Sequence, residues 1–132
     1  MQHPCYCVLL RSAARKVTAV YDAALEPVGL SVAQYSLLRT VEQAQPVSLT
    51  EIGRRTELDR STIGRNVKLL QRRGFVAVKP GNDQREATVV LAEAGESALR
   101  DGLPLWNEAQ SKIETSMGPQ FVGQLRSFLE VL

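Results

Sequence analysis

The order of elements expected between residues 49 and 91 constrains the fold of this chain most strongly. Apolar residues recur first at helical spacing and then alternate as they do in strands. A short helix, a turn, a second helix and a β-hairpin together predict a winged helix-turn-helix unit. We place these elements at 49–55, 56–59, 60–73, and 75–78 with 87–91.

Local capping and turn signals support these boundaries. Either Ser48 or Thr50 is expected to cap the first helix, because short hydroxyl side chains accept hydrogen bonds from a helix N-terminus. Gly74 is a typical residue for the end of the second helix. The sequence Pro80-Gly81-Asn82-Asp83 has the composition of a tight turn and predicts the loop between the two strands.

Four further helices are expected around this unit. Ser31 is an N-cap candidate for the second of them, in which Tyr35, Leu38 and Val41 fall on one face. Gly118-Pro119 separates the last two. The sequence therefore predicts a mainly α chain with a small β-hairpin wing, in the order α-α-α-α-β-β-α-α. The flanking helices are predicted at 4–26, 31–42, 93–116 and 120–131.

Charge is distributed unevenly along the chain. Residues 54–85 contain nine Lys and Arg residues but only three Asp and Glu residues, whereas the remainder contains seven and eleven. About one quarter of the chain thus carries a net charge of +6 and the rest −4. A cationic block on an otherwise acidic protein indicates a polyanionic partner.

The second helix of the unit has two chemically distinct faces. Ile63, Val67 and Leu70 cluster on one side and are expected to pack inward. The opposite side carries short polar groups at its N-terminal end and long cations further on, within an arc of roughly 60°. This arrangement suits a recognition helix, whose N-terminal end meets base edges while its flanks bind phosphates. The candidate DNA-binding residues of this helix are Arg60, Ser61, Thr62, Arg65, Lys68 and Arg72.

The hairpin tip adds two candidate DNA-binding residues. Arg85 beside a recognition helix is placed to enter the narrow, electronegative minor groove. Asp83 is expected to hydrogen-bond Arg85 or the local backbone and to orient the guanidinium. The alternative interpretation is that the cations of the second helix and Arg85 in the loop are ordinary solvated side chains.

Several segments together resemble the MarR family of bacterial regulators: Leu49–Gly53, Ser61–Arg65, Gly74–Val76, Asp83–Arg85 and Val90–Gly95. The resemblance implies a winged-helix DNA-binding region over 31–92 joined to a dimerisation region formed by 4–26 and 93–132. It also implies a sequence-specific regulator, usually a repressor, with Ser61, Thr62 and Arg65 in the major groove. Ala92 stands where the family often has Thr.

A homodimer is expected because one recognition helix contacts only a few base pairs. Specific binding needs two half-sites about one helical turn apart, which a two-fold dimer on an inverted repeat supplies. The terminal helices offer apolar surface for this contact, although the same residues could instead close the core of a monomer. These residues are Leu9, Leu10, Phe121, Leu125, Phe128, Leu129 and Leu132.

Both cysteines, Cys5 and Cys7, fall in the first turn of the first helix. Partial positive charge at a helix N-terminus favours the thiolate, which is the reactive form. Residues two apart do not face each other on a helix, so a partner thiol is expected from a second subunit or a small molecule. Two cysteines and His3 are too few for a structural metal site. The alternative is that both are small packed residues.

The first helix also resembles the organic-hydroperoxide-sensing branch of the MarR family. The resemblance lies in Cys7–Arg15 and places Cys7 at the peroxide-reactive position. Tyr21 matches one tyrosine that supports the thiol, whereas Arg11 and Val32 replace two others. It implies that oxidation of Cys7 releases DNA. The alternative is that the regulator responds to a small aromatic or anionic ligand bound near Trp106, and that the cysteines have a structural role.

Other classes of protein fit the sequence less well. The N-terminal segment has no apolar stretch long enough for a signal peptide or a membrane span, so a cytoplasmic protein without membrane contact is expected. His3 is the only histidine, and no carboxylate pair or phosphate loop has motif spacing. We therefore expect that the protein is not an enzyme and that it binds neither a cofactor nor a metal. A thiol peroxidase and a winged-helix module that binds protein remain the alternatives.

Overall fold

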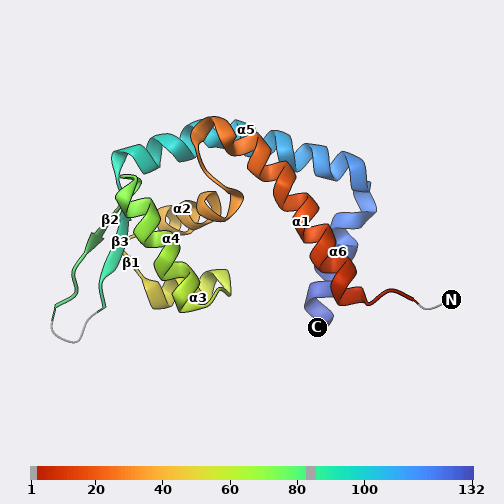
Figure 1. The fold of residues 1–132 in the computed structure, drawn as a ribbon, viewed down its shortest axis with the longest axis horizontal. Coiled ribbons are helices and arrows are strands. Elements are labelled where there is room, and N and C mark those ends of the chain that lie inside the picture. The colour runs from red at the N-terminus through yellow and green to blue at the C-terminus, as the bar shows by residue number, and fades with distance from the viewer. Residues whose placement is uncertain (1–2, 83–85) are drawn as a thin grey trace.

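The computed structural model describes residues 3–82 and 86–132. The chain forms an arch in which α5 spans the top, the winged helix-turn-helix forms one leg, and the start of α1 lies with α6 in the other (Figure 1). The elements in order are α1 (Tyr6–Leu25), the 3₁₀ turn η1 (Glu26–Val28), α2 (Val32–Ala44), β1 (Val47–Ser48), α3 (Leu49–Thr56), α4 (Arg60–Arg72), β2 (Val76–Lys79), β3 (Thr88–Leu91), α5 (Glu93–Met117) and α6 (Pro119–Val131).

The predicted start of α2 is confirmed. The Ser31 hydroxyl accepts a hydrogen bond from the backbone N–H of Gln34 at 3.1 Å, and the Gln34 side chain accepts one from the Ser31 N–H at 3.0 Å. This reciprocal pair satisfies two N–H groups that have no partner inside the helix. Tyr35, Leu38 and Val41 are buried together, as their spacing predicted.

The ends of α3 and α4 are fixed by short polar side chains and glycine. Of the two candidates, Ser48 caps α3 and accepts from the Glu51 N–H at 3.1 Å. Asp59 caps α4. Gly74, at φ +81°, follows the C-terminus of α4 in the left-handed region that glycine adopts at little cost, which confirms the predicted end.

The sheet contains three strands rather than the two predicted. β2 and β3 form the expected antiparallel hairpin, with Val76 opposite Leu91, and β1 pairs with the other edge of β3, with Val47 opposite Val89. A strand of two residues shows no alternation of apolar side chains, so the sequence does not predict β1. β1 attaches the start of α3 to the first residues of β3, next to the loop of the hairpin.

The core lies inside the winged helix-turn-helix leg and extends under α5. Large side chains from five elements have no exposed surface there, and each contributes about 1.5–3 kcal/mol of burial free energy. They include Leu38, Val41, Ile52, Ile63, Leu70 and Val89. α5 is attached at Gly95, where an added Cβ would lie 2.2 Å from the Phe75 carbonyl oxygen. This close approach lets the Ala92 N–H bond the same carbonyl at 3.0 Å.

The other leg of the arch is apolar but uncovered. None of the α6 residues, all of which the structure describes, is buried, and Leu25 is the one buried residue of α1. Leu9 is 47% exposed, Leu125 41% and Phe128 39%. The alternative that these side chains close the core of the monomer is therefore wrong for this chain.

No helix in the described part of the chain combines the length and apolar character that crossing a bilayer requires.

Candidate nucleic-acid interface

Helix α4 is oriented as its periodicity predicted. Ile63, Val67 and Leu70 are buried in the core. The opposite face is open to solvent, with Thr62 half-buried at its edge. Among the described residues, none of the cations on this face has a carboxylate within ion-pair distance, so their charge is available to a ligand. The exposed residues of the face are Ser61, Arg65, Lys68 and Arg72.

The N-terminus of this face is organised by Asp59. Its carboxylate accepts hydrogen bonds from the Thr62 backbone N–H at 2.7 Å and from the Ser61 hydroxyl at 3.1 Å. Hydrogen bonds from Thr62, and then from Ser61, hold the pKa of the Asp59 carboxyl below its usual 3.8. The Arg65 guanidinium lies 3.5 Å from the Thr62 hydroxyl. The short polar groups and the first cation thus have defined positions at the end that would meet base edges.

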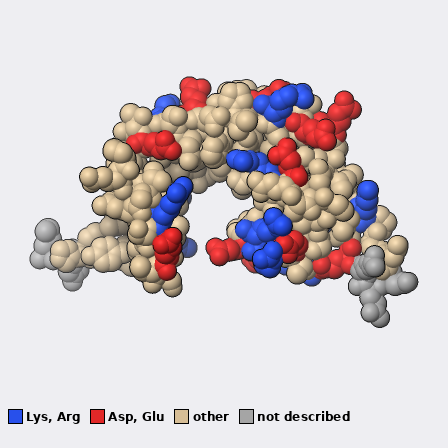
Figure 2. Space-filling model, turned by 180° about the vertical axis from the view of Figure 1, so that it is seen from behind, with Lys and Arg blue, Asp and Glu red and all other residues tan. Residues whose placement is uncertain are grey.

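Two cations of the basic block on α3 are neutralised locally. The Glu51 carboxylate accepts two hydrogen bonds from Arg54, at 2.5 and 2.8 Å, and one from Arg55 at 3.0 Å. These contacts, chiefly that with Arg54, lower the pKa of Glu51 to about 2. Figure 2, which shows the molecule from behind, has Lys and Arg side chains close to Asp and Glu on several parts of that face.

Arg60, a predicted DNA contact, is also paired. Its guanidinium lies 2.9 Å from the Glu86 carboxylate, which additionally accepts a hydrogen bond from the Thr50 hydroxyl at 2.7 Å. The hydrogen bond from Thr50 is the main cause that holds the pKa of Glu86 below its usual value, and Arg60 adds to it. The sequence does not predict the role of Glu86, because its partners lie 26 and 36 residues earlier and no periodicity connects them.

Arg73 belongs to the fold and not to the exposed face of α4. Its guanidinium donates a hydrogen bond of 2.5 Å to the Gly29 carbonyl and lies 4.9 Å from the centre of the Phe75 ring. The contact joins the end of α4 to the turn that precedes α2.

The predicted wing residues Asp83 and Arg85 lie outside the described residues. Their roles in DNA binding therefore stay predictions. The strands beside them are described, and Lys79 is paired with Thr88 at the end of the hairpin next to the loop.

Comparison with known proteins identifies the family of this chain. A profile of the MarR family matches residues 28–86, which include α2, α3, α4 and β2. The crystal structure of the transcriptional regulator MosR of M. tuberculosis in complex with DNA superposes with a TM-score of 0.85. It is 31% identical in sequence, over 97% of this chain and 96% of MosR. The chain belongs to the MarR family.

Curated relatives of this MarR chain are named as transcriptional regulators. The helix-turn-helix-type regulator YwoH of Bacillus subtilis is 31% identical over 92 residues, which are 70% of this chain and 67% of YwoH. SarZ of Staphylococcus haemolyticus is 26% identical over 90 residues, which are 67% of this chain and 61% of SarZ. The match therefore spans about three fifths of SarZ.

The two cysteines of the MarR chain lie at the start of α1. Cys5 is the N-cap residue and Cys7 is in the first turn, and both side chains are exposed. The alternative of two small packed residues is therefore wrong within a single chain. Tyr6, between them, is 74% exposed and lines the apolar groove between α1 and α6.

Tyr21 does not lie beside Cys7 within one chain. It follows 14 residues later on the same helix, which corresponds to about 21 Å. Its hydroxyl instead donates a hydrogen bond to the Gln110 side chain of α5, and its ring centre is 6.1 Å from that of Trp106. Burial, followed by the charge of Glu114, raises the pKa of Tyr21. Contact between Tyr21 and Cys7 therefore requires a second chain.

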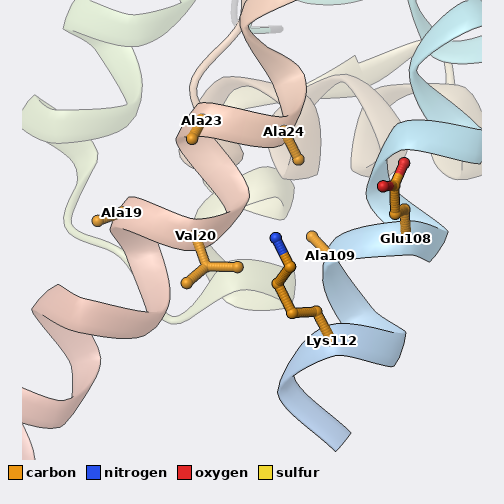
Figure 3. Close-up of a pocket in the computed structure, with 7 residues that line it drawn as sticks. All are labelled: Ala19, Val20, Ala23, Ala24, Glu108, Ala109 and Lys112. Atoms are coloured by element: carbon orange, nitrogen blue, oxygen red, sulfur yellow. The ribbon is translucent and has the colours of Figure 1, made fainter. Parts of the chain in front are cut away.

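A cavity of about 460 Å³ lies between α1 and α5 in this MarR chain. Figure 3 shows the Lys112 side chain rising between Val20 and Ala109, while the rest of the α1 wall consists of alanine methyl groups. Glu108 is the other charged residue of the lining. Aliphatic side chains with one amine and one carboxylate provide few of the converging polar groups of a specific ligand site.

Proposed function

We propose that this chain is a sequence-specific DNA-binding regulator that acts as a homodimeric repressor on an inverted repeat. The observation that carries the proposal is the exposed face of α4, where three cations without carboxylate partners among the described residues lie opposite a fully packed core face. The complex of the related MosR with DNA supports it.

The residues on the exposed face of α4 fall into two groups, one suited to base edges and one suited to phosphates. Ser61, Thr62 and Arg65 lie at the N-terminal end of α4, where a recognition helix meets base edges, and the Arg65 fork suits guanine. Lys68 and Arg72 follow at one-turn spacing and suit phosphate oxygens. Arg85 is proposed to enter the minor groove with Asp83 orienting it. We assign DNA binding to 31–92.

The second copy of the chain is proposed to cover the apolar leg formed by 4–26 and 93–132. A groove of about 400 Å³ separates α1 and α6 there. Contiguous apolar surface of this kind marks a protein contact, and a two-fold dimer requires a patch that can pair with itself. The groove is lined by Tyr6, Leu9, Leu10, Phe121, Gln124, Leu125 and Phe128.

The DNA-binding proposal is tested with an operator selected from a random pool of duplexes. Arg65→Ala should relax sequence preference at one position of each half-site, whereas Lys68→Ala should weaken binding to all duplexes and reduce the salt slope by about 1. Arg100→Ala, which removes an exposed cation of α5, is the matched control. Equal effects of all three substitutions would contradict the proposal.

The dimer is tested by sedimentation. The wild-type chain should sediment at about twice 14.5 kDa at micromolar concentration. Leu125→Glu, which places a charge in the groove between α1 and α6, should shift the equilibrium toward monomer. A monomeric wild-type chain would contradict the proposal.

Oxidation at Cys7 is the second proposal. It is favoured by the exposure of the Cys7 side chain and by the adjacent residue Tyr6, which lines the apolar groove. The Cys7 thiolate attacks one oxygen of a hydroperoxide, the O–O bond breaks, and the sulfur becomes a sulfenate while an alcohol leaves. A polar sulfenate or a mixed disulfide beside the groove would alter the dimer contact and weaken DNA binding. Cys7→Ser should abolish release by peroxide, with Cys5→Ser as the matched control.

The small-ligand alternative has less support. The crevice between α2 and α5, lined by Tyr35, Arg39 and Arg100 among others, has a volume of about 180 Å³. Ligand pockets usually measure about 300–1,000 Å³. Trp106 lies instead against Arg39, whose guanidinium is 5.6 Å from the ring centre, and against Tyr21.

A further inference from the structure

One carboxylate connects the three parts of the DNA-binding unit. Glu86 lies two residues before β3 and reaches the second residue of α3, Thr50, and the first residue of α4, Arg60. The Arg60 guanidinium also lies 3.5 Å from the Thr50 hydroxyl, so the three side chains form a closed triangle. Both helix N-termini carry partial positive charge, which adds to the attraction for this carboxylate.

We propose that Glu86 is a specificity-determining residue that keeps Arg60 from binding DNA phosphate. This inference rests on the proposed function of the chain in DNA binding. Arg60 is the first residue of the recognition helix, so a phosphate would otherwise be within reach of its long side chain. Glu86 acts as an internal substitute for that phosphate.

The pair is exposed, because the side chain of Arg60 is 66% accessible and that of Glu86 is 37% accessible. Attraction between exposed charges is weak, so the pair alone would not compete with a phosphate. If Arg60 moves to the DNA, however, the Glu86 carboxylate is also left without its cation beside the negatively charged DNA. Repulsion between Glu86 and the phosphates opposes that transfer, and the hydrogen bond from Thr50 holds the carboxylate in place.

The consequence is a smaller sequence-independent contribution to binding. Affinity for random DNA comes almost entirely from neutralised phosphates, and each contact removed lowers it at physiological salt. Contacts of Arg65 with base edges do not depend on Arg60 and are retained. Glu86 thus increases the ratio of operator affinity to random affinity, which is the quantity that decides occupancy in a genome.

The test measures the salt dependence of binding to a random-sequence duplex of 30 base pairs. Glu86→Gln keeps an acceptor for Thr50 but removes the charge that holds Arg60. We expect the slope of log affinity against log salt to become steeper by about 0.9. This change corresponds to an additional loss of affinity of about 3.5-fold between 50 and 200 mM salt.

Glu57→Gln is the matched control. It removes the same charge from the turn between α3 and α4, where the described residues show no side-chain hydrogen bond or ion pair for Glu57. A general effect of charge would steepen the slope equally in both variants and would overturn the inference.

The double variant Arg60→Ala/Glu86→Gln identifies the responsible cation. Its slope should return to the wild-type value, because the added phosphate contact belongs to Arg60. In the wild-type background, Arg60→Ala should reduce the slope by less than half as much as Lys68→Ala, a comparison that does not depend on folding of the Glu86 variant. An equal reduction would show that Arg60 already binds phosphate and would overturn the inference. A wild-type chain without salt-dependent binding would instead contradict the proposed function.

Discussion

Arg73 donates a hydrogen bond of 2.5 Å to the carbonyl oxygen of Gly29, whereas its neighbour Arg72 belongs to the exposed face of α4. The Arg73 guanidinium also lies 4.9 Å from the centre of the Phe75 ring. Two adjacent arginines at the end of one helix therefore serve different purposes, one in the fold and one in the proposed DNA contact.

Substitution of these two arginines should produce opposite phenotypes. Arg73→Ala removes the hydrogen bond and the aromatic contact and should lower the free energy of unfolding by about 1–2 kcal/mol. Arg72→Ala should change it by less than about 0.5 kcal/mol, as surface substitutions usually do. The salt slope of DNA binding should instead fall for Arg72→Ala. Urea unfolding and fluorescence anisotropy check the pair, and parallel effects on both quantities would contradict this division.

Asp59→Ala should destabilise α4 because it removes the N-cap. The lost hydrogen bonds to the Thr62 N–H and the Ser61 hydroxyl should lower the Tm by about 3–6 °C. Asp59→Asn retains a capping oxygen and should lose much less. The carboxylate form makes these bonds, so its contribution is present above pH 3.8, the usual pKa, and is lost as the pH falls below it. Calorimetry at pH 7 and at low pH tests both points, and an equal Tm loss for both variants would contradict the cap.

Gly95→Ala should destabilise the attachment of α5 to Phe75, the residue before β2. The added Cβ would lie 2.2 Å from the Phe75 carbonyl oxygen, and a backbone atom cannot move aside as a side chain can. We expect a loss of about 3 kcal/mol or more in the free energy of unfolding. Gly64→Ala is the matched control, because nothing lies within 4 Å of its added Cβ and alanine favours a helix interior by up to about 1 kcal/mol. Similar losses for both substitutions would contradict the close approach.

The ion pairs of Glu51 with Arg54 and Arg55 predict a contribution to the free energy of unfolding that depends on pH. Arg54 and Arg55 lower the pKa of Glu51 from its usual 4.5 to about 2, so the folded chain binds a proton there less readily than the unfolded chain. The resulting stabilisation is complete above pH 4.5 and disappears as the pH falls toward 2. The difference in unfolding free energy between wild type and Glu51→Gln should follow this curve. In an Arg54→Ala/Arg55→Ala background the dependence should vanish, and its persistence would contradict the assignment.

The periodicity of apolar residues predicted the helices and their buried faces. The faces of α4, with Ile63 buried and Lys68 exposed, follow from a spacing that any helix imposes. The hairpin and the cap at Ser31 follow from local chemistry in the same way. The strand at Val47–Ser48 could not be predicted, because its existence depends on a tertiary partner in β3.

Contacts between distant residues explain the remaining differences in the candidate site. Arg60 is a candidate DNA contact because it is a cation at the start of the recognition helix, yet its pairing with Glu86 depends on how the hairpin folds back against α3 and α4. The resemblance matches Tyr21 to a tyrosine that supports the thiol. Helix geometry places Tyr21 about 21 Å from Cys7 in one chain, so this support would have to come from a second chain. Sequence patterns located the surface, and the tertiary structure decided which of its charges are available.

The most direct test of the central claim is cleavage of DNA by a reagent attached to the recognition helix. An iron chelate is attached at Ser61→Cys in a chain that also carries Cys5→Ser and Cys7→Ser, and the complex with a selected operator is activated. Cleavage should occur at two places related by two-fold symmetry, with centres about 10 base pairs apart. Uniform cleavage along the duplex, or cleavage at a single place, would contradict a dimer that inserts both copies of α4 into adjacent turns of the major groove.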